Sequence, residues 1–222
     1  MALAHDYTDV QYLPIPPKGA DTAAGLFRLS VSMTFAKDEE IYGQDEDADL
    51  IYRVLDGAVR TTRVMADGRR QIGDFYLAGD IFGLEAGSTH RFAAEAVRDS
   101  IILVIKASTL RSSGGDVGRM GWEATRRELE RAQEHVIMLG RKTACERVAS
   151  FLKDLSDKSG DLRVVDLPMG RQDIADYLGL TIETVSRMLS QLQASRIVSF
   201  CATRRFRIVN PGGLARLANQ TL

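Results

Sequence analysis

The chain has 222 residues, of which 45% are hydrophobic, so it is long enough for one or two domains, each with a buried core. Its longest clear apolar run, residues 101–105, is far shorter than the ~20 residues that cross a bilayer, and the first residues lack the layout of a secretion signal. We therefore expect a cytoplasmic protein with no membrane partner. Two cysteines, Cys145 and Cys201, are too few for a disulfide framework or a cysteine-only metal site.

The net charge of −1 conceals an asymmetry along the chain. Residues 141–222 carry 13 Lys and Arg against 8 Asp and Glu, a net charge of +5, whereas residues 1–140 carry 16 against 22, a net charge of −6. A basic segment of this kind can meet a polyanion, although a solvated basic face has the same composition.

The first part of the chain predicts an arm followed by an antiparallel β domain. Residues 1–26 are polar and rich in Pro and Gly, and we expect at most one short helix there. Residues 27–115 alternate short apolar strands with turn signals, which favours a barrel or roll. Asp-Gly pairs predict two hairpins, and two further turns are expected to separate the strands DIFGLE, FAAEAV and IILVI. In chain order these turns lie at Asp56-Gly57, Asp67-Gly68, Gly79-Asp80 and Arg98-Asp99-Ser100.

A long helix is predicted over residues 116–140, because the segment contains no proline and many helix formers. One heptad register places apolar or small residues on a single seam with charged residues around it, as in a dimerising coiled coil. The alternative is an ordinary helix packed on its own domain. The seam residues, which we predict to form a homodimer interface, are Trp122, Thr125, Leu129, Ala132, Val136 and Leu139.

Beyond a break near Gly140, residues 141–222 predict a small helical domain with a hairpin. A helix with one apolar face from Ala144 to Leu155 comes first. The stretch DIADYLGLTIETVSRMLSQLQ, residues 173–193, then gives two short helices joined at Gly179, a residue that can take positive φ, with Thr181 as the N-cap of the second helix. The apolar positions match a helix-turn-helix, namely Ile174, Leu178, Leu180, Val185 and Met188, with small Ala175 at the crossing.

In this motif the second helix enters the major groove of double-stranded DNA and its N-terminal residues reach base edges. The predicted base contacts are Ile182, Glu183, Ser186 and Arg187. Glu183 and Arg187 are also spaced for an intrahelical ion pair, and both roles are compatible. A hairpin wing follows at RIVSFCATRRFRIV, and the predicted phosphate contacts are Arg171, Thr181, Thr184, Arg204 and Arg205.

Nearly the whole chain resembles the Crp/Fnr superfamily of bacterial transcription regulators, through residues 56–85, the long helix, ACERVASFL (144–152) and residues 170–193. Within it, IETVSR resembles the Fnr and FixK branch, which reads Glu-x-x-Ser-Arg; Ile182 stands where the Crp branch has an arginine. The resemblance implies a cyclic-nucleotide-binding-like β-roll, a winged helix-turn-helix, and a homodimer that binds a TTGAT-N4-ATCAA palindrome, usually to activate transcription. It also implies that RNA polymerase contacts the loop of Met65, Ala66, Asp67, Gly68 and Arg69.

Two features of the family are missing, so we expect no cofactor. Residues 1–50 contain no cysteine for an iron–sulfur cluster. The cyclic nucleotide motif is displaced at Gly83-Leu84-Glu85, and Phe92 stands where the family has the hydroxyl that contacts the phosphate. An effector-gated sensor with a small ligand in the roll remains the alternative, because Glu85 and Arg91 are retained.

The remaining chemistry-bearing residues give no catalytic pattern. His5, His90 and His135 are scattered without a nucleophile or metal spacing, and we expect His90 to be solvated in a turn and the protein not to be an enzyme. Cys145 is expected to be a buried, inert thiol. Cys201, in the predicted wing, is either inert or, beside Arg204 and Arg205, prone to oxidation.

Overall fold

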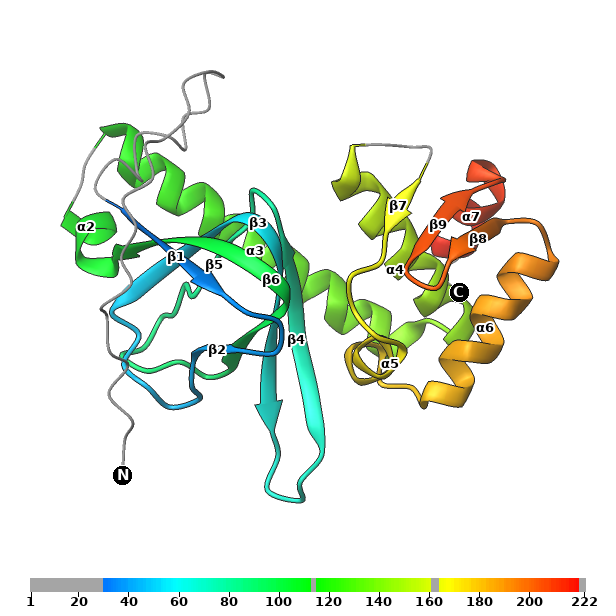
Figure 1. Ribbon diagram of the computed structural model, residues 1–222, viewed down its shortest axis with the longest axis horizontal. Helices are drawn as coiled ribbons and strands as arrows, with labels where there is room; N and C mark the ends of the chain where they lie inside the picture. Colours follow the sequence, from blue (N-terminus) through cyan, green and yellow to red (C-terminus); the bar gives the residue numbers. More distant parts are fainter. Residues whose placement is uncertain (1–29, 113–114, 161–163, 220–222) are drawn as a thin grey trace. The chain divides into compact units, whose positions relative to one another are not determined.

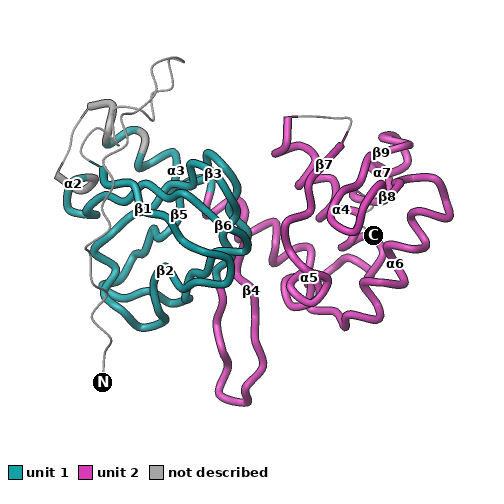
Figure 2. The backbone as a smooth tube through the Cα atoms, in the orientation of Figure 1, with its two compact units in different colours: residues 1–61, 75–127 teal, residues 62–74, 128–222 magenta. Residues whose placement is uncertain are grey.

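The computed structural model describes residues 30–112, 115–160 and 164–219, so the predicted arm lies outside the described residues. These residues form two compact units (Figure 2). One contains the described residues up to Thr61 together with Phe75–Arg127, and the other contains Thr62–Asp74 together with the described residues from Glu128 onward. Within the described ranges, no helix has the length and apolar character needed to span a membrane.

An antiparallel sheet dominates the N-terminal half of the chain (Figure 1). Its main strands run in the order β1-β6-β3-β4, with β2 paired to β6 and β5 paired to β3. In the described residues the sheet is open, so the roll form of the prediction is confirmed and the closed barrel is not. The strands are β1 (Val31–Phe35), β2 (Glu40–Tyr42), β3 (Leu50–Val64), β4 (Arg70–Leu77), β5 (Ile81–Phe82) and β6 (Ala93–Lys106).

Aromatic rings fill the inside of the roll. Tyr42 stacks on His90 with ring centroids 3.7 Å apart, and Tyr52 stacks on Phe82 at 5.1 Å. Tyr76 meets Phe82 at 5.2 Å, and all five residues are buried. Gly83, at φ 78°, lies so close to Tyr52 that an added Cβ would be 2.7 Å from the ring. Close packing of these rings forms the core of the roll.

Only one of the two predicted Asp-Gly hairpins is present. Asp67-Gly68 turns the chain between β3 and β4, with Met65 N–H donating to the Arg69 carbonyl at 2.8 Å. Asp56-Gly57 instead lies inside β3, and the predicted turn near Ser100 lies inside β6, so both of those predictions are wrong. The physical reason is that the segment around Gly57 in β3 contacts Ser100 in β6. The Ser100 hydroxyl accepts from Ala58 N–H at 3.1 Å, and its side chain fills the space beside Gly57, which has φ 102°.

Two helices follow the sheet, α2 (Ala107–Ser112) and α3 (Gly115–Arg141). The helix predicted over residues 116–140 is thus present, and it ends one residue after Gly140. Ion pairs between neighbouring turns stabilise its polar faces, such as Glu123 with Arg126 at 2.6 Å and Glu128 with Arg131 at 2.9 Å.

The C-terminal part folds as a helix-turn-helix with a small antiparallel sheet in the order β7-β9-β8 (Figure 1). Thr143 caps the first helix in a capping box with Glu146, and Gly160 ends it in the left-handed conformation. The elements are α4 (Ala144–Ser159), β7 (Val165–Asp166), α5 (Arg171–Leu178), α6 (Ile182–Ala194), β8 (Val198–Ala202), β9 (Arg205–Ile208) and α7 (Pro211–Asn219).

Candidate nucleic-acid interface

The turn between α5 and α6 has the geometry that the sequence predicts. Gly179 closes α5 at φ 61° and ψ 40°, and the Leu180 N–H donates to the Ala175 carbonyl at 3.0 Å. Thr181 is the N-cap of α6, and its hydroxyl accepts from the Thr184 N–H at 3.3 Å. The positive φ and the immediate cap let one helix end and the next begin within three residues.

Burial separates the two faces of α6. Its inward residues are Val185, Met188, Leu189 and Leu192, and each is buried. Ile182, Glu183 and Arg187 are exposed, and Ser186 is half-buried. The four predicted base-contacting residues therefore lie away from the core of the domain and close together at the N-terminal end of α6.

The Glu183 carboxylate is turned toward the start of its own helix. A hydrogen bond from its own backbone N–H, followed by one from Thr181, lowers the pKa of Glu183. Among the described residues Glu183 forms no ion pair with Arg187, so the intrahelical pair considered from the sequence is not made. The exposed Glu183 carboxylate can therefore accept, and the exposed Arg187 guanidinium can donate, independently of each other.

Among the predicted phosphate-contacting residues, Arg171 reaches α6 from the preceding helix. It begins α5, and its Nη1 donates to the Ser186 hydroxyl at 3.1 Å. Thr181 and Thr184 belong to the cap of α6, where their two hydroxyl oxygens lie 3.2 Å apart. Arg171 thus lies beside Ser186, and the two threonines lie at the N-terminal end of the same helix.

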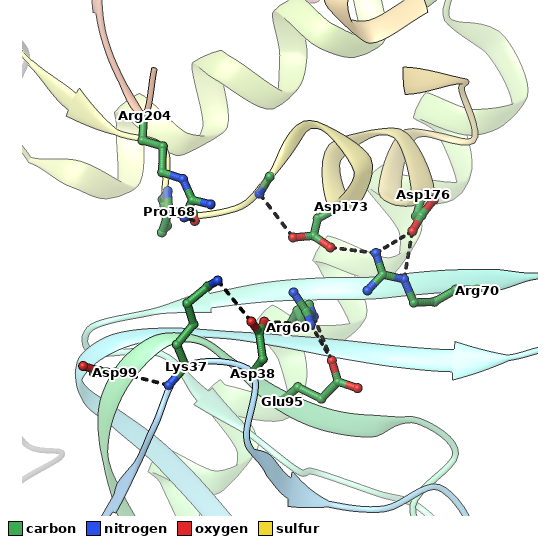
Figure 3. Close-up of polar contacts among 11 residues, drawn as sticks. Lys37, Asp38, Arg60, Arg70, Glu95, Asp99, Pro168, Asp173, Asp176 and Arg204 are labelled. Carbon is green, nitrogen blue, oxygen red and sulfur yellow. Dashed lines mark hydrogen bonds and ion pairs between the residues drawn. The ribbon is translucent and has the colours of Figure 1, made fainter. Parts of the chain in front are cut away.

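The wing holds the other two predicted phosphate contacts. Arg204 lies in the turn between β8 and β9, where its Nη1 donates to the Pro168 carbonyl at 2.7 Å (Figure 3). Arg205 forms an exposed ion pair with Asp166 at 2.9 Å. Both residues are exposed, but each is already tied to the segment that precedes α5. Cys201 in the same wing is exposed, and its thiol donates to the Arg205 carbonyl at 3.5 Å.

Arg147, in the first turn of α4, has a structural role that the sequence did not predict. Arg147 donates to three carbonyls: Lys142 at 2.9 Å, Leu139 at 2.7 Å and Leu178 at 2.9 Å. Leu139 lies in the last turn of α3, Lys142 directly follows that helix, and Leu178 ends α5, so one guanidinium satisfies acceptors that the helix ends leave open. Its place on the apolar helix ACERVASFL gave no local signal of this role.

The predicted seam of α3 is exposed in the single chain. Trp122 is 69% exposed and Val136 is 71% exposed, and Leu129 is similarly open. Thr125 and Ala132 are exposed and Leu139 is half-buried. An apolar hollow on the same surface is lined by Ala132, Gln133, Val136 and Ile137. Large apolar side chains on a helix exposed to this degree are typical of a surface that meets another molecule.

In the hairpin loop predicted to contact polymerase, all five residues are exposed. Gly68 takes φ 81° and donates to the Met65 carbonyl at 2.9 Å. Arg69 Nε donates to the Asp67 carboxylate at 2.7 Å, and the backbone and side chain of Arg69 together lower the pKa of Asp67. The loop is therefore a tight, ordered turn with Met65 and Ala66 presented beside it.

Glu85, the acidic residue retained from the nucleotide motif, is hydrogen-bonded to Arg91 of the same chain. Glu85 accepts from the Arg91 N–H at 3.1 Å and from Arg91 Nε at 3.0 Å, so each carboxylate oxygen has a donor. His90, predicted to be solvated, is only 1% exposed, which corrects that prediction. Its ring is covered because it stacks on Tyr42 in the core of the roll.

His135 and Cys145 lie on α3 and α4, respectively. His135 Nε2 lies 2.9 Å from the Tyr177 carbonyl, and the two rings stack at 4.2 Å. Cys145 is half-buried, and burial raises the pKa of its thiol. Among the described residues, no group of three or more His, Cys, Asp or Glu side chains could hold a metal ion.

Comparison with known proteins identifies both parts of the chain. The family model of the cyclic nucleotide-binding domain matches residues 32–113, and that of the Crp-like helix-turn-helix domain matches residues 146–217. Both matches agree with the open β-roll and the α5–α6 turn described above.

Relatives extend the match over most of the chain. It is 45% identical over 197 residues to the nitrogen fixation regulation protein FixK of Azorhizobium caulinodans, covering 85% of this chain and 79% of that protein. It is 41% identical to FixK of Rhizobium meliloti, covering 84% and 86%. A solved structure of FixK2 from Bradyrhizobium japonicum has a TM-score of 0.83 and 45% identity, covering 87% of this chain and 99% of that one. The chain is therefore not an enzyme but belongs to the Crp/Fnr family of transcription regulators and carries the family's helix-turn-helix DNA-binding domain.

Proposed function

We propose that this protein is a homodimeric transcription activator that reads a TTGAT-N4-ATCAA palindrome without a cyclic nucleotide or an iron–sulfur cofactor. In this proposal residues 27–115 form the roll, 116–140 the dimerisation helix and 141–222 the DNA-binding domain. The observation that carries the proposal is the outer face of α6, where Glu183, Ser186 and Arg187 are presented beside the capped helix N-terminus. This is the end of a recognition helix that reaches base edges.

The residue types on this face support the proposed half-site. Arginine binds the O6 and N7 of guanine bidentately, which suits Arg187 to the single guanine of TTGAT. The Glu183 carboxylate can accept from a cytosine amino group, and Ser186 accepts or donates. Ile182 offers no donor, so a TGTGA half-site of the Crp type should bind less tightly. Arg171 and the cap residues Thr181 and Thr184 are proposed to contact phosphate, as are Arg204 and Arg205 of the wing.

The exposed seam of α3 supports a second copy of the chain as its partner. Trp122, Leu129 and Val136 recur at seven-residue intervals, and Ala132 between them permits close approach of two helices. A two-fold dimer places two recognition helices on half-sites about one turn, ~10–10.5 base pairs, apart. RNA polymerase is proposed to contact the exposed loop from Met65 to Arg69.

Ligand-independent action is supported by the chemistry of the roll. Both oxygens of Glu85 are engaged by Arg91, the rings of Tyr42, Tyr52 and Phe82 occupy the interior, and Phe92 offers no hydroxyl to a phosphate. The effector-gated alternative makes a distinct prediction. Saturating cyclic nucleotide, at 100 times its Kd, would stabilise the fold by about 2.7 kcal/mol and raise the midpoint of thermal unfolding. We expect no such shift.

The test of the proposed function is selection of bound DNA from a random pool by the purified full-length protein. We expect a palindrome with TTGAT half-sites, followed by weaker binding of TGTGA in a competition titration. Recovery of no enriched sequence, or equal affinity for the two half-sites, would reject the proposed specificity.

A further inference from the structure

An arginine of the β3–β4 hairpin holds the first helix of the helix-turn-helix by two carboxylates. Arg70, the first residue of β4, donates from Nε to Asp176 at 2.9 Å and from Nη2 to Asp173 at 2.7 Å, while Nη2 also lies 2.7 Å from Asp176 (Figure 3). All three residues belong to the same compact unit, although more than 100 positions separate Arg70 from each aspartate in the chain.

The two carboxylates depend on this guanidinium. Asp173 and Asp176 are three residues apart on one face of α5, and their side chains are only 10% and 15% exposed. Two such anions repel each other unless a cation is shared between them. Burial opposes the charge of Arg70, but its hydrogen bonds with Asp176 and Asp173 and their negative charges outweigh that effect, so the pKa of Arg70 is raised.

Each carboxylate is also fixed from the opposite side. Asp173 accepts from the Gly170 N–H at 3.2 Å, which completes the cap of α5, and Asp176 accepts from Gln172 Nε2 at 2.7 Å. Arg70 therefore binds two carboxylates whose orientations are fixed by hydrogen bonds at the start of α5. A fork of planar donors against two fixed acceptors holds an orientation as well as a distance.

Further contacts in the same unit link α3 to the hairpin and to α5. Arg131 of α3 lies 3.5 Å from Asp74 of β4, and His135 of α3 contacts the Tyr177 carbonyl of α5. The only residues between α3 and α4 are Lys142 and Thr143, so the covalent connection alone is a short joint. Side chains thus hold α5 against the hairpin, and Arg70 is a hairpin residue that reaches α5 through two carboxylates.

We propose that Arg70 is a positioning residue for DNA recognition, which fixes α5 against the hairpin and thereby sets the half-site spacing that a dimer accepts. This inference rests on the proposed reading of a palindrome by a dimer. A rigidly held pair of recognition helices matches one spacing, because the two helices must enter grooves about one turn apart. If the two recognition helices are held less rigidly, they sample several orientations. The affinity for DNA with the preferred spacer then falls, and the difference in affinity between this spacer and the others becomes smaller.

The test uses the full-length protein and the palindrome that the wild type selects from a random pool, with its central spacer shortened or lengthened by one base pair. We expect Arg70→Ala to lower affinity at the selected spacing about tenfold and to reduce the discrimination between spacers. Arg70→Lys should fall between, because one ammonium replaces a fork that spans two carboxylates. The matched control is Arg63→Ala, which removes the same charge from an exposed position of the same hairpin and should keep the spacer profile.

The variant Asp176→Asn distinguishes a positioning role of Arg70 from a purely electrostatic one. If Arg70 acted simply as a positive charge near DNA, removing this carboxylate would tighten binding and leave the spacer profile unchanged. If it positions α5, Asp176→Asn weakens binding, flattens the profile, and adds little in the Arg70→Ala background. The ratio of affinities between spacers does not depend on the fraction of folded protein, so a merely destabilised variant would keep the wild-type ratio.

The inference would be overturned if Arg70→Ala kept the wild-type ratio of DNA affinities between spacers, or if Asp176→Asn bound DNA more tightly. An absence of spacer preference in the wild type would overturn it as well. A different selected half-site would instead revise only the proposed sequence, because the spacer series is built on whichever palindrome is recovered.

Discussion

At the scale of single residues, the arginines of the DNA-binding domain fall into different structural classes. Arg187 is exposed on α6, whereas Arg204 donates to the Pro168 carbonyl and Arg171 to Ser186. An exposed guanidinium on the outer face of a recognition helix is available for a base edge, and one anchored in the wing is suited to a fixed phosphate. The two kinds of contact should respond differently to DNA sequence.

Arg187→Ala should weaken binding to a TTGAT site by ~1–3 kcal/mol and relax the preference at its guanine, because a bidentate base contact is lost. Arg204→Ala should instead weaken all sequences similarly and reduce the salt slope by about one, because a phosphate contact carries no sequence information. Competition titrations at several salt concentrations measure both effects. An Arg187→Ala loss shared equally by random DNA would contradict the assignment.

His90 gives the roll a predicted pH dependence. Burial lowers the pKa of His90, which is 1% exposed and stacked on Tyr42, while the nearby carboxylates of Glu85, Glu46 and Asp49 oppose that shift. The unfolded chain therefore binds more protons than the folded one at mildly acid pH. The contribution to stability is present above the unfolded pKa of about 6.5 and is lost as the pH falls below it.

The measurement is the free energy of unfolding by urea from pH 5 to 8, for wild type and His90→Phe. Phenylalanine keeps an aromatic ring against Tyr42 and cannot titrate, so the slope below about pH 6.5 should flatten. Comparing slopes separates titration from any change in packing. An identical slope in the variant would show that another group is responsible.

At the scale of secondary-structure elements, α3 combines stabilised polar faces with an apolar face that remains exposed in the single chain. Its polar faces are satisfied by pairs such as Glu123 with Arg126, while Trp122, Leu129 and Val136 remain exposed. Exposed surface of this kind gains little from folding of the single chain. Its burial against a second α3 would supply the missing hydrophobic stabilisation.

Val136→Glu should abolish the proposed dimer, because the two-fold axis places like charges opposite each other in a dry interface. Arg127→Glu is the matched control, since it adds the same side chain on the far side of the heptad from the seam. Sedimentation at micromolar concentration distinguishes the variants. A Val136→Glu protein that remains dimeric would show that the seam lies elsewhere.

At the scale of the whole molecule, the roll retains the family fold with altered chemistry at the nucleotide motif. Arg91 donates to both carboxylate oxygens of Glu85, and Phe92 has no hydroxyl to offer a phosphate. Residues 1–50 contain no cysteine, so that segment has no thiolate for a cluster. These observations support the proposal that the protein binds DNA without a small ligand.

Transcription with purified protein and RNA polymerase, from a promoter that carries the palindrome, should proceed equally with or without cyclic nucleotide. It should also be unaffected by an iron chelator, because the proposed activity uses no iron. A promoter with a scrambled palindrome is the control for specific activation. A strict requirement for either addition would contradict ligand-independent action.

Local sequence by itself determined the features that short-range physics controls. Apolar periodicity, a glycine at 179 and a cap at Thr181 lie within one short segment and predict the helix-turn-helix, because turn geometry and helix capping act over a few residues. The Asp67-Gly68 hairpin and the exposed seam of α3 follow from similarly local patterns. The DNA-binding function was accessible from these alone.

Tertiary structure decided the features that depend on distant partners. Asp56-Gly57 continues a strand instead of turning, because Ser100 of β6 bonds the backbone beside it. His90 is buried because Tyr42 covers its ring, and Arg70 reaches Asp173 and Asp176 across more than 100 residues. A turn signal, a histidine or an exposed-looking arginine has no fixed environment in the sequence, since its neighbours are chosen only when the chain packs.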